Sequence, residues 1–347
     1  MKTFIALSFF ICSIRCFSQE DTAFSVKYFS TLPHISIRAI EAKSDRKMWF
    51  AANHGIWGYT EDGGESWHLD SIKADTIYPE FRSMAVLNDS TALLLSISSP
   101  AYLFKTTNKG RSWKQVYKNT HKDIFFDSMK FLDEEQGVAV GDPIDGCFQI
   151  ITTQDGGTTW KQTDCSNIPK AAEGEALFAS SNTNINISYQ SISFVTGGSK
   201  ARLFSSLDDG KHFDDVFNTP ITHGGKLSGI FSFQFLSEEV GIIAGGNYER
   251  TDSTITGLAI TRDGGQTWKE LKSQRPFFGS CVQFQSGNTL FVTGHDGTFI
   301  GSGTKINEVK DESGHSLKFN TLRISPSKKA VWLAGDKGRI AFITFAQ

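Results

Sequence analysis

Residues 60–67 read Thr-Glu-Asp-Gly-Gly-Glu-Ser-Trp, and this short stretch decides the fold. It returns as Thr-Gln-Asp-Gly-Gly-Thr-Thr-Trp at 153–160 and as Thr-Arg-Asp-Gly-Gly-Gln-Thr-Trp at 261–268. Two degenerate copies lie at 107–113, with Lys109 at the expected place of the aspartate, and at 207–213, which ends in Phe instead of Trp. A motif that recurs in this way predicts a fold built from repeated units.

Each residue type in the motif has a local role in a tight turn. The aspartate can accept backbone N–H groups of its own turn, and glycine adopts a positive φ at little cost. The terminal aromatic residue offers a large apolar surface for packing between units. We therefore expect a scaffold hairpin and not an active site. The residues assigned to these hairpins are Asp62, Trp67, Trp113, Asp155, Trp160, Asp209, Phe213, Asp263 and Trp268.

The spacing of the motif indicates a β-propeller. Its aromatic ends lie at positions 67, 113, 160, 213 and 268, so the intervals are 46, 47, 53 and 55 residues. A four-stranded propeller blade takes ~40–50 residues. Two more strand-rich units without a good motif begin at Gly279 and Phe319. The sequence predicts an all-β fold of seven four-stranded blades, with six or eight as open alternatives.

The two ends of the chain are expected to complete one ring. The last unit ends at Gln347 with little room for a fourth strand, and residues 24–29 alternate as a strand does. Closing the ring with this N-terminal strand removes exposed sheet edges. No linker divides residues 19–347, so we expect a single domain. The longest irregular segment, 165–187, has the length of a functional or flexible loop.

The first 18 residues are typical of a secretory signal peptide. Lys2 precedes an apolar run at 4–14, and small residues favour cleavage before Gln19. The expected location is the periplasm or the outside of the cell. No later segment is apolar enough to span a bilayer. A formal net charge of −2 argues against a nucleic-acid partner, and we expect a monomer.

Three cysteines follow the signal segment. Cys147 and Cys165 lie eight residues before and ten residues after Asp155, so they flank one hairpin almost symmetrically. Opposed strand residues approach closely enough for a disulfide. The sequence leaves open whether these two are bridged or whether all three, with Cys281, are buried thiols.

The motif resembles the Asp-box of bacterial sialidase (BNR) repeats and sortilin-type receptors. Segments 125–131, 137–146, 173–180, 194–198 and 229–248 further resemble the bacterial photosystem II stability and assembly factor-like propellers. The resemblance implies the fold over nearly the whole chain. It implies that the box lies at the periphery, away from the ligand. Members of this family often carry an "oxidoreductase" or glycosyl hydrolase label.

The sequence contains no motif that identifies a catalytic or cofactor site. It lacks the glycine-rich turn of dinucleotide-binding folds and the common hydrolase and metalloprotease signatures. Its eight histidines are scattered, so we predict neither a metal nor a cofactor. The Phe-Arg-Ile-Pro segment of sialidases is absent, and Phe81-Arg82 is only a fragment of it.

Aligning the expected inner strands points to the mouth of the central channel. In the aligned strands, the first position holds a polar residue in most blades, the second position a small residue and the third position an apolar residue. The polar position is expected to face the channel, either as an Arg–Asp–Arg salt-bridge network or as a site for an anion or carboxylate. The candidate ligand-binding residues are Arg38, Arg82, Asp127, Gln190 and Asn320.

Two loops add acidic residues near this mouth. Asp142 and Asp145 lie in one loop, and Glu173 and Glu175 lie in the irregular segment. They are either solvated surface charges or groups that hold a cation or perform acid–base chemistry.

Three functions follow from these features. The leading hypothesis is an exported, non-enzymatic propeller that binds a protein or small ligand at its channel face, as an assembly factor does. The alternative is a glycan hydrolase that uses carboxylates at the channel mouth. A weaker alternative is an oxidoreductase, as related sequences are labelled.

Overall fold

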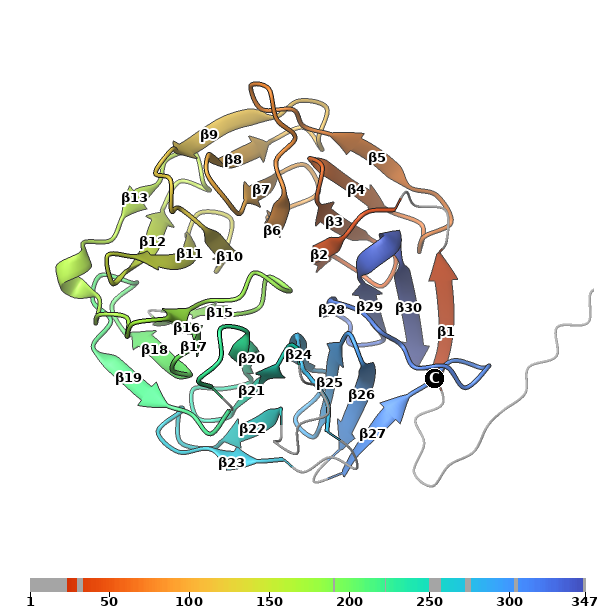
Figure 1. The fold of residues 1–347 in the computed structure, drawn as a ribbon. Coiled ribbons are helices and arrows are strands. Elements are labelled where there is room, and N and C mark those ends of the chain that lie inside the picture. Colours follow the sequence, from red (N-terminus) through yellow and green to blue (C-terminus); the bar gives the residue numbers. More distant parts are fainter. Residues whose placement is uncertain are drawn as a thin grey trace, which may run out of the picture.

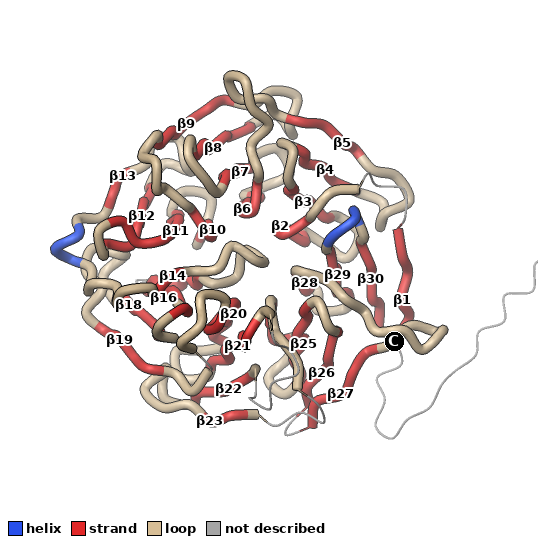
Figure 2. The backbone as a smooth tube through the Cα atoms, in the orientation of Figure 1, coloured by secondary structure: helices blue, strands red, loops and turns tan. Residues whose placement is uncertain are grey.

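The chain folds into a ring of blades around a central axis (Figure 1). This computed structural model describes residues 24–29, 34–189, 191–221, 223–249, 257–271, 276–302 and 305–345. The predicted signal peptide at 1–18 lies outside these residues. Nearly all regular structure is antiparallel sheet, with two short 3₁₀ turns (Figure 2). No described helix is long and apolar enough to cross a bilayer.

Seven sheets form seven blades, as the sequence predicts. In each blade the first strand lies nearest the axis. The strands in chain order are β2 (Ile37–Ala42), β3 (Met48–Ala52), β4 (Ile56–Thr60) and β5 (His68–Ser71) in blade one; β6 (Phe81–Val86), β7 (Ala92–Ser96), β8 (Ala101–Thr106) and β9 (Lys114–Asn119) in blade two; β10 (Phe126–Phe131), β11 (Gly137–Ile144), β12 (Cys147–Thr153) and β13 (Lys161–Gln162) in blade three; β15 (Ile185–Ser188), β16 (Ser191–Val195), β18 (Arg202–Ser206) and β19 (Asp215–Asn218) in blade four.

The remaining blades follow the same order. Blade five is widened to six strands by two short strands from an earlier part of the chain. Its strands are β20 (Ser228–Phe235), β21 (Gly241–Asn247), β22 (Leu258–Thr261) and β23 (Lys269–Glu270), with β14 (Glu175–Ala176) and β17 (Gly197–Gly198) added; blade six has β24 (Cys281–Phe284), β25 (Thr289–Gly294), β26 (Gly297–Ser302) and β27 (Lys305–Val309); blade seven has β28 (Thr321–Ile324), β29 (Ala330–Ala334), β30 (Ile340–Phe345) and β1 (Phe24–Phe29); the 3₁₀ turns are η1 (Cys165–Asn167) and η2 (Asp336–Gly338).

The N-terminal strand closes the ring, which confirms the predicted closure. Strand β1 pairs antiparallel with β30 from Phe24↔Phe345 to Phe29↔Ile340, so blade seven is made from both ends of the chain. The Phe29 ring stacks on Trp332 of its own blade at 5.8 Å and packs edge-on against Trp67 of blade one, also at 5.8 Å. Closure therefore joins blade seven to blade one by packing as well as by backbone pairing.

Apolar side chains fill every interface between blades. Seven hydrophobic clusters of described residues are each shared by two neighbouring blades. The aromatic residues of the repeated motif belong to these interfaces: Trp113 packs edge-on against Trp57 of blade one at 5.1 Å. Burial of this area is the main favourable term in folding. The aromatic residue of each repeat therefore helps to hold neighbouring blades together.

The motif turns have the predicted local bonding. In blade five, the Thr267 hydroxyl and backbone N–H donate to the Asp263 carboxylate and lower the pKa of that carboxyl to about 2. The Thr261 hydroxyl donates to Asp263 and accepts the buried Gly265 N–H at 2.9 Å. The threonine that opens the motif therefore links the carboxylate to the turn.

The prediction for the fourth turn is wrong by one residue. Asp208, and not Asp209, accepts the N–H groups of Lys211 and His212. Asp209 follows it with φ 61°, in the left-handed position that Gly63 occupies in blade one. The same shift applies in blade two, where Asn108 accepts the Ser112 N–H. In both turns another residue replaces the first glycine of the motif. Aligning the repeats by sequence therefore places the hydrogen-bond acceptor one residue too late.

The second glycine of the motif is required by packing between blades. A Cβ atom at Gly110 would lie 2.0 Å from the Trp57 ring, and one at Gly157 would lie 2.3 Å from Leu93. Both contacts are with the preceding blade. The positive φ values of these glycines add a conformational reason for the same choice.

The motif turns lie on the face opposite to the start of the inner strands. In blades one, two, three and five, the turn is bonded to the turn that joins the first two strands of its own blade. The backbone bonds include Gly63 N–H to Arg46 O, Gly156 N–H to Glu135 O and Gly264 N–H to Glu239 O, each at 2.9 Å. The inner strands begin at the other face, where the candidate ligand-binding residues lie.

The two adjacent aspartates of blade four provide a matched test of the turn. We expect Asp208→Gly to lower the free energy of unfolding by about 1–2 kcal/mol, because backbone N–H groups lose their acceptor. We expect Asp209→Gly to leave it unchanged or raise it by up to about 1 kcal/mol, because glycine suits a positive φ. Urea denaturation measures both. Equal losses in the two variants would contradict the assignment of Asp208.

Candidate functional site at the channel mouth

In four blades, the inner strand has a β-bulge at the position that the sequence alignment predicts to face the channel. The pairing of the first two strands shifts by one residue in blades one, two, three and five. A bulge leaves one residue unpaired and re-aims its side chain. The unpaired residues are Arg38, Arg82, Asp127 and Phe231. The shared irregularity explains why these side chains meet at the mouth.

Blades six and seven place Ser280 and Asn320 just before their inner strands begin. The Asn320 side chain donates to Asp336 Oδ1 at 3.0 Å, and Ser36 Oγ donates to the same atom at 2.7 Å. Burial acts to raise the pKa of Asp336, but these two hydrogen bonds and the charge of Arg38 lower it. Asn320 thus positions a carboxylate at the rim.

Blade four departs from the predicted pattern. Its innermost strand is β15, and the segment expected to fill that place forms β16, the second strand. The predicted site residue Gln190 lies outside the described residues, between Ser188 and Ser191, which pair at the hairpin end. The prediction for Gln190 itself therefore stays untested. The irregular segment that precedes β15 had hidden this short strand.

Residues 177–184, here called the plug, enter the channel ahead of β15 (Figure 1). All eight side chains are buried. Asn182 has φ 58°, accepts the Met129 N–H at 2.9 Å and donates to Met84 O at 2.8 Å, so it bridges blades two and three. Ser181 Oγ donates to Ser280 O at 2.6 Å, which reaches blade six.

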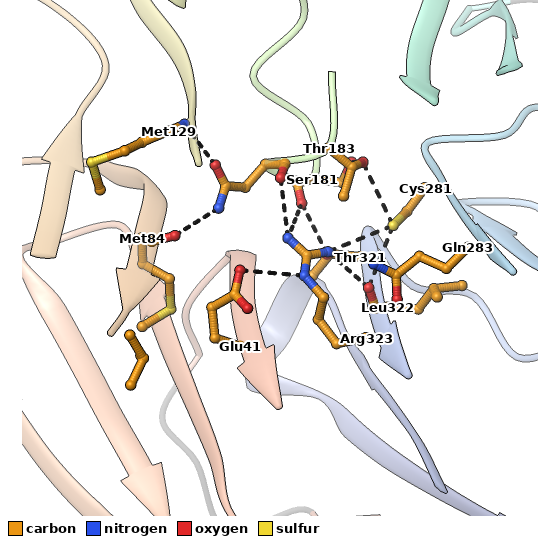
Figure 3. A network of polar contacts seen from close by, with 12 residues as sticks. Glu41, Met84, Met129, Ser181, Thr183, Cys281, Gln283, Thr321, Leu322 and Arg323 are labelled. Carbon is orange, nitrogen blue, oxygen red and sulfur yellow. Dashed lines mark hydrogen bonds and ion pairs between the residues drawn. The ribbon is translucent and has the colours of Figure 1, made fainter. Parts of the chain in front are cut away.

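A buried arginine holds the plug from below (Figure 3). Arg323 of β28 donates to Asn182 O at 3.1 Å and to Ser181 O at 3.4 Å. Its charge is paired with Glu41 of β2 at 3.5 Å. Buried polar groups are tolerated when they are bonded. The plug is therefore fixed by polar contacts with the surrounding blades, and it forms the floor of the mouth.

Two further anchors hold the segment that leads to the plug. A disulfide joins Cys147 of β12 to Cys165, with the Cα atoms 5.6 Å apart. Cys281 is a buried free thiol. Glu175 is buried against Arg202, whose guanidinium donates to both carboxylate oxygens. Thr196 Oγ1 and the Ala172 N–H also donate to Glu175.

The two arginines of the mouth lie side by side in different states of pairing. Arg82 donates to Glu80 at 2.6–2.7 Å and to Ala179 O of the plug at 3.5 Å. Arg38 forms no ion pair with any described carboxylate. Burial and the charge of Arg82 lower the pKa of Arg38. The predicted Arg–Asp–Arg salt-bridge network does not form, because Glu80 takes the place of Asp127 as partner.

Asp127 is a fully buried carboxylate next to these arginines. Neither of its oxygens has a hydrogen-bond partner at normal geometry among the described residues. Burial and the neighbouring charge of Asp142 raise its pKa well above the usual range, and the charge of Arg82 opposes this rise. Asp127 therefore interacts with the charges of both Arg82 and Asp142.

Aromatic rings form one wall of the mouth. Phe178 of the plug stacks on Phe231 at 3.9 Å, and Phe278 packs edge-on against Phe231 at 4.6 Å. Tyr248 and His295 complete the wall, 4.8 Å apart, and Tyr248 is partly exposed beside Arg38. Burial lowers the pKa of His295. The mouth thus offers guanidinium groups beside an apolar surface.

The four predicted loop carboxylates have three different environments. Glu175 is neutralised by Arg202, whereas Asp145 and Glu173 are exposed. Asp142 is half-buried and accepts the Leu177 N–H at 2.8 Å. Burial raises the pKa of Asp142 to about 6, against the effect of that bond. No group of three potential metal ligands occurs among the residues that the structure describes.

Sequence reasoning missed several residues of the mouth. Glu80 directly precedes the Phe81-Arg82 pair, and Asp336 lies in a Gly-Asp-Lys-Gly turn, but neither is on an inner strand. Tyr248 and His295 lie in connections between second and third strands. Blade topology could have predicted the positions of Tyr248 and His295, because the turns between the second and third strands lie at the same face as the start of the inner strands.

The structure resembles known propellers, although no protein-family model and no curated protein sequence matches the chain. A structure described as YCF48 bound to D1 peptide aligns with TM-score 0.69 at 15% identity, covering 96% of this chain and 100% of that one. YCF48 from Cyanidioschyzon merolae aligns at 0.65 with 12% identity, covering 92% and 98%. The RRP9 WD40 repeats align at 0.63 with 12% identity, covering 93% and 98%. These similarities establish the propeller fold, in agreement with the resemblance read from the sequence.

Removing the Asn182 side chain tests the plug. We expect Asn182→Gly to lower the free energy of unfolding by about 2–4 kcal/mol, because two buried backbone groups lose their partners while glycine keeps the positive φ. Gly174→Ala, in the exposed part of the same segment but also at positive φ, should cost only about 1 kcal/mol. Chemical denaturation measures both. A loss at Asn182 no larger than that at Gly174 would show that the plug contributes little.

The raised pKa of Asp142 predicts a specific pH dependence. Its folded-state pKa of about 6 exceeds the usual value, so the folded protein binds a proton more tightly than the unfolded chain between pH 4 and 6. Stability therefore falls as pH rises through this window. Asp142→Asn should remove that fall and be the more stable form at pH 7.5 by about 2 kcal/mol. Asp145→Asn, three residues away and exposed, should follow the wild-type profile.

Proposed function

We propose that this propeller binds an extended segment of another protein at the channel mouth and that it acts outside the cytoplasm as a binding or assembly factor. The observation that carries the proposal is the guanidinium of Arg38. It is partly buried beside a second arginine, its Nε has no hydrogen-bond partner among the described residues, and it forms no ion pair with any of their carboxylates, although the charge of Asp336 and the Tyr248 hydroxyl act on it. A bound carboxylate would add a partner in direct contact through a paired hydrogen-bond geometry.

Three features of the mouth support a peptide as the ligand. The plug closes the channel, so a ligand would rest on a floor and would not thread through the ring. Tyr248 and His295, which pack on the buried Phe278, offer aromatic contact next to the charge. One of the structures with the same fold is described as bound to a peptide. That description applies to YCF48, and its extension to this chain is part of the proposal.

The hydrolase alternative depends on Asp142 and Glu173. A pKa of about 6 would suit Asp142 as a general acid, and both residues line one hollow with Glu175. The lining of that hollow contains no aromatic side chain on which a sugar ring could stack. Asp142 is also bonded to the plug. The binding function therefore accounts for more of the geometry.

A peptide library tests the binding function without a known partner. We expect wild-type protein to select Asp- or Glu-containing members from a bead-bound library of acetylated octapeptide amides. Arg38→Gln should weaken binding of the selected peptides by about tenfold or more, because a charged hydrogen-bonded pair is lost. The control is Lys122→Gln on the same face, where the side chain is 87% exposed. A library without acidic selection, or equal losses in both variants, would contradict the proposal.

A further inference from the structure

A hollow of about 520 Å³ lies beside the arginine mouth, between the loop after β11 and the segment that leads to the plug. No lysine or arginine lines it. Its walls combine Pro143 and three alanines with the carboxylates of Asp142, Glu173 and Glu175. The hollow is therefore both open enough for a side chain and acidic.

Two of the three carboxylates in this hollow are not neutralised by a cation in the structure. Glu175 is paired with Arg202, so it contributes no net negative charge. Glu173 is exposed at the rim and forms no ion pair with a described residue. Asp142 lies deeper and its recorded hydrogen bond comes from the Leu177 N–H. A cation entering the hollow would meet Glu173 first and Asp142 next.

A third carboxyl group lies behind the wall and adds no charge to the hollow. Asp127 is fully buried, and burial together with the charge of Asp142 raises its pKa well above the usual range, which favours its neutral form. Arg82 is close to Asp127 but is paired with Glu80 and donates to the plug. The negative charge of the hollow therefore comes from Asp142 and Glu173, and no arginine of the mouth lines it.

We propose that this hollow is a second subsite that receives a lysine or arginine side chain of the same bound polypeptide. The proposal rests on the proposed peptide-binding function and extends it to a ligand with an acidic and a basic residue. The aliphatic stem would lie along Pro143 and the alanines of the wall. The cationic head would reach Asp142 and Glu173 and stabilise their ionised forms.

Selected peptides test this subsite. We expect the octapeptides bound by wild type to contain a basic residue at a fixed spacing from the acidic one. For one such peptide, fluorescence anisotropy should give an affinity about tenfold higher than for its Lys→Met counterpart, which has similar length and no charge. In the double variant Asp142→Asn, Glu173→Gln this ratio should fall to about one.

Two controls keep the result interpretable. Glu135→Gln removes an exposed carboxylate on the opposite face and should keep the tenfold ratio. Glu173→Gln alone changes only an exposed side chain, so it should lower the ratio even if the double variant fails to fold. A ratio near one in wild type, or an unchanged ratio in both variants, would overturn the second subsite. Displacement of the Lys peptide by CaCl₂ but not by NaCl at equal ionic strength would also overturn it in favour of a metal site.

The outcomes separate the two proposals. Acidic selection without basic selection removes only the second subsite and leaves peptide binding at the arginines intact. Loss of acidic selection in wild type removes the proposed function itself.

Discussion

The plug in the central channel is the contact on which the proposed binding face depends. A ring of seven blades leaves inner strands whose edges face one another across an axis, and residues 177–184 supply hydrogen-bond partners to several of them at once. Because polar atoms buried without partners are costly, this segment must match the blades closely. Held by these hydrogen bonds, the plug fills the channel and forms the floor of the mouth.

The mouth gains its chemistry from departures from regular sheet. The bulge in four inner strands sets Arg38, Arg82 and Asp127 apart from the alternation that would otherwise bury or expose them in turn. The floor then fixes one of the two arginines, since Arg82 contacts Ala179 O. Arg38 lacks an ion pair with any described carboxylate beside an aromatic wall. The scaffold motifs lie on the other face, away from the mouth.

The sequence predicts the ring better than it predicts the mouth. Seven blades and closure by residues 24–29 follow from the spacing of a turn motif and from alternation, because both depend on local chemistry that each repeat satisfies alone. Arg38 and Arg82 lie side by side for the same reason, as equivalent positions of a repeat, whereas Asp127 at the third such position is fully buried. The alignment fails in blade four, where β15 follows the plug as the innermost strand and Ser191–Val195 form the second strand. Asp209 was chosen over Asp208 because a left-handed aspartate replaces the usual glycine. Tyr248 and His295 join the site through contacts between distant loops, which no local pattern encodes, whereas Glu80 lies two residues before Arg82 and outside the aligned position.

Hydrogen–deuterium exchange over residues 165–190 tests most directly whether the plug closes the channel. If residues 177–184 are packed as described, their peptide should exchange as slowly as the inner strand β10, while residues 169–174 exchange at the rate of an exposed loop. Rapid exchange over 177–184 in an otherwise protected propeller would contradict the account, because the mouth would then have no fixed floor.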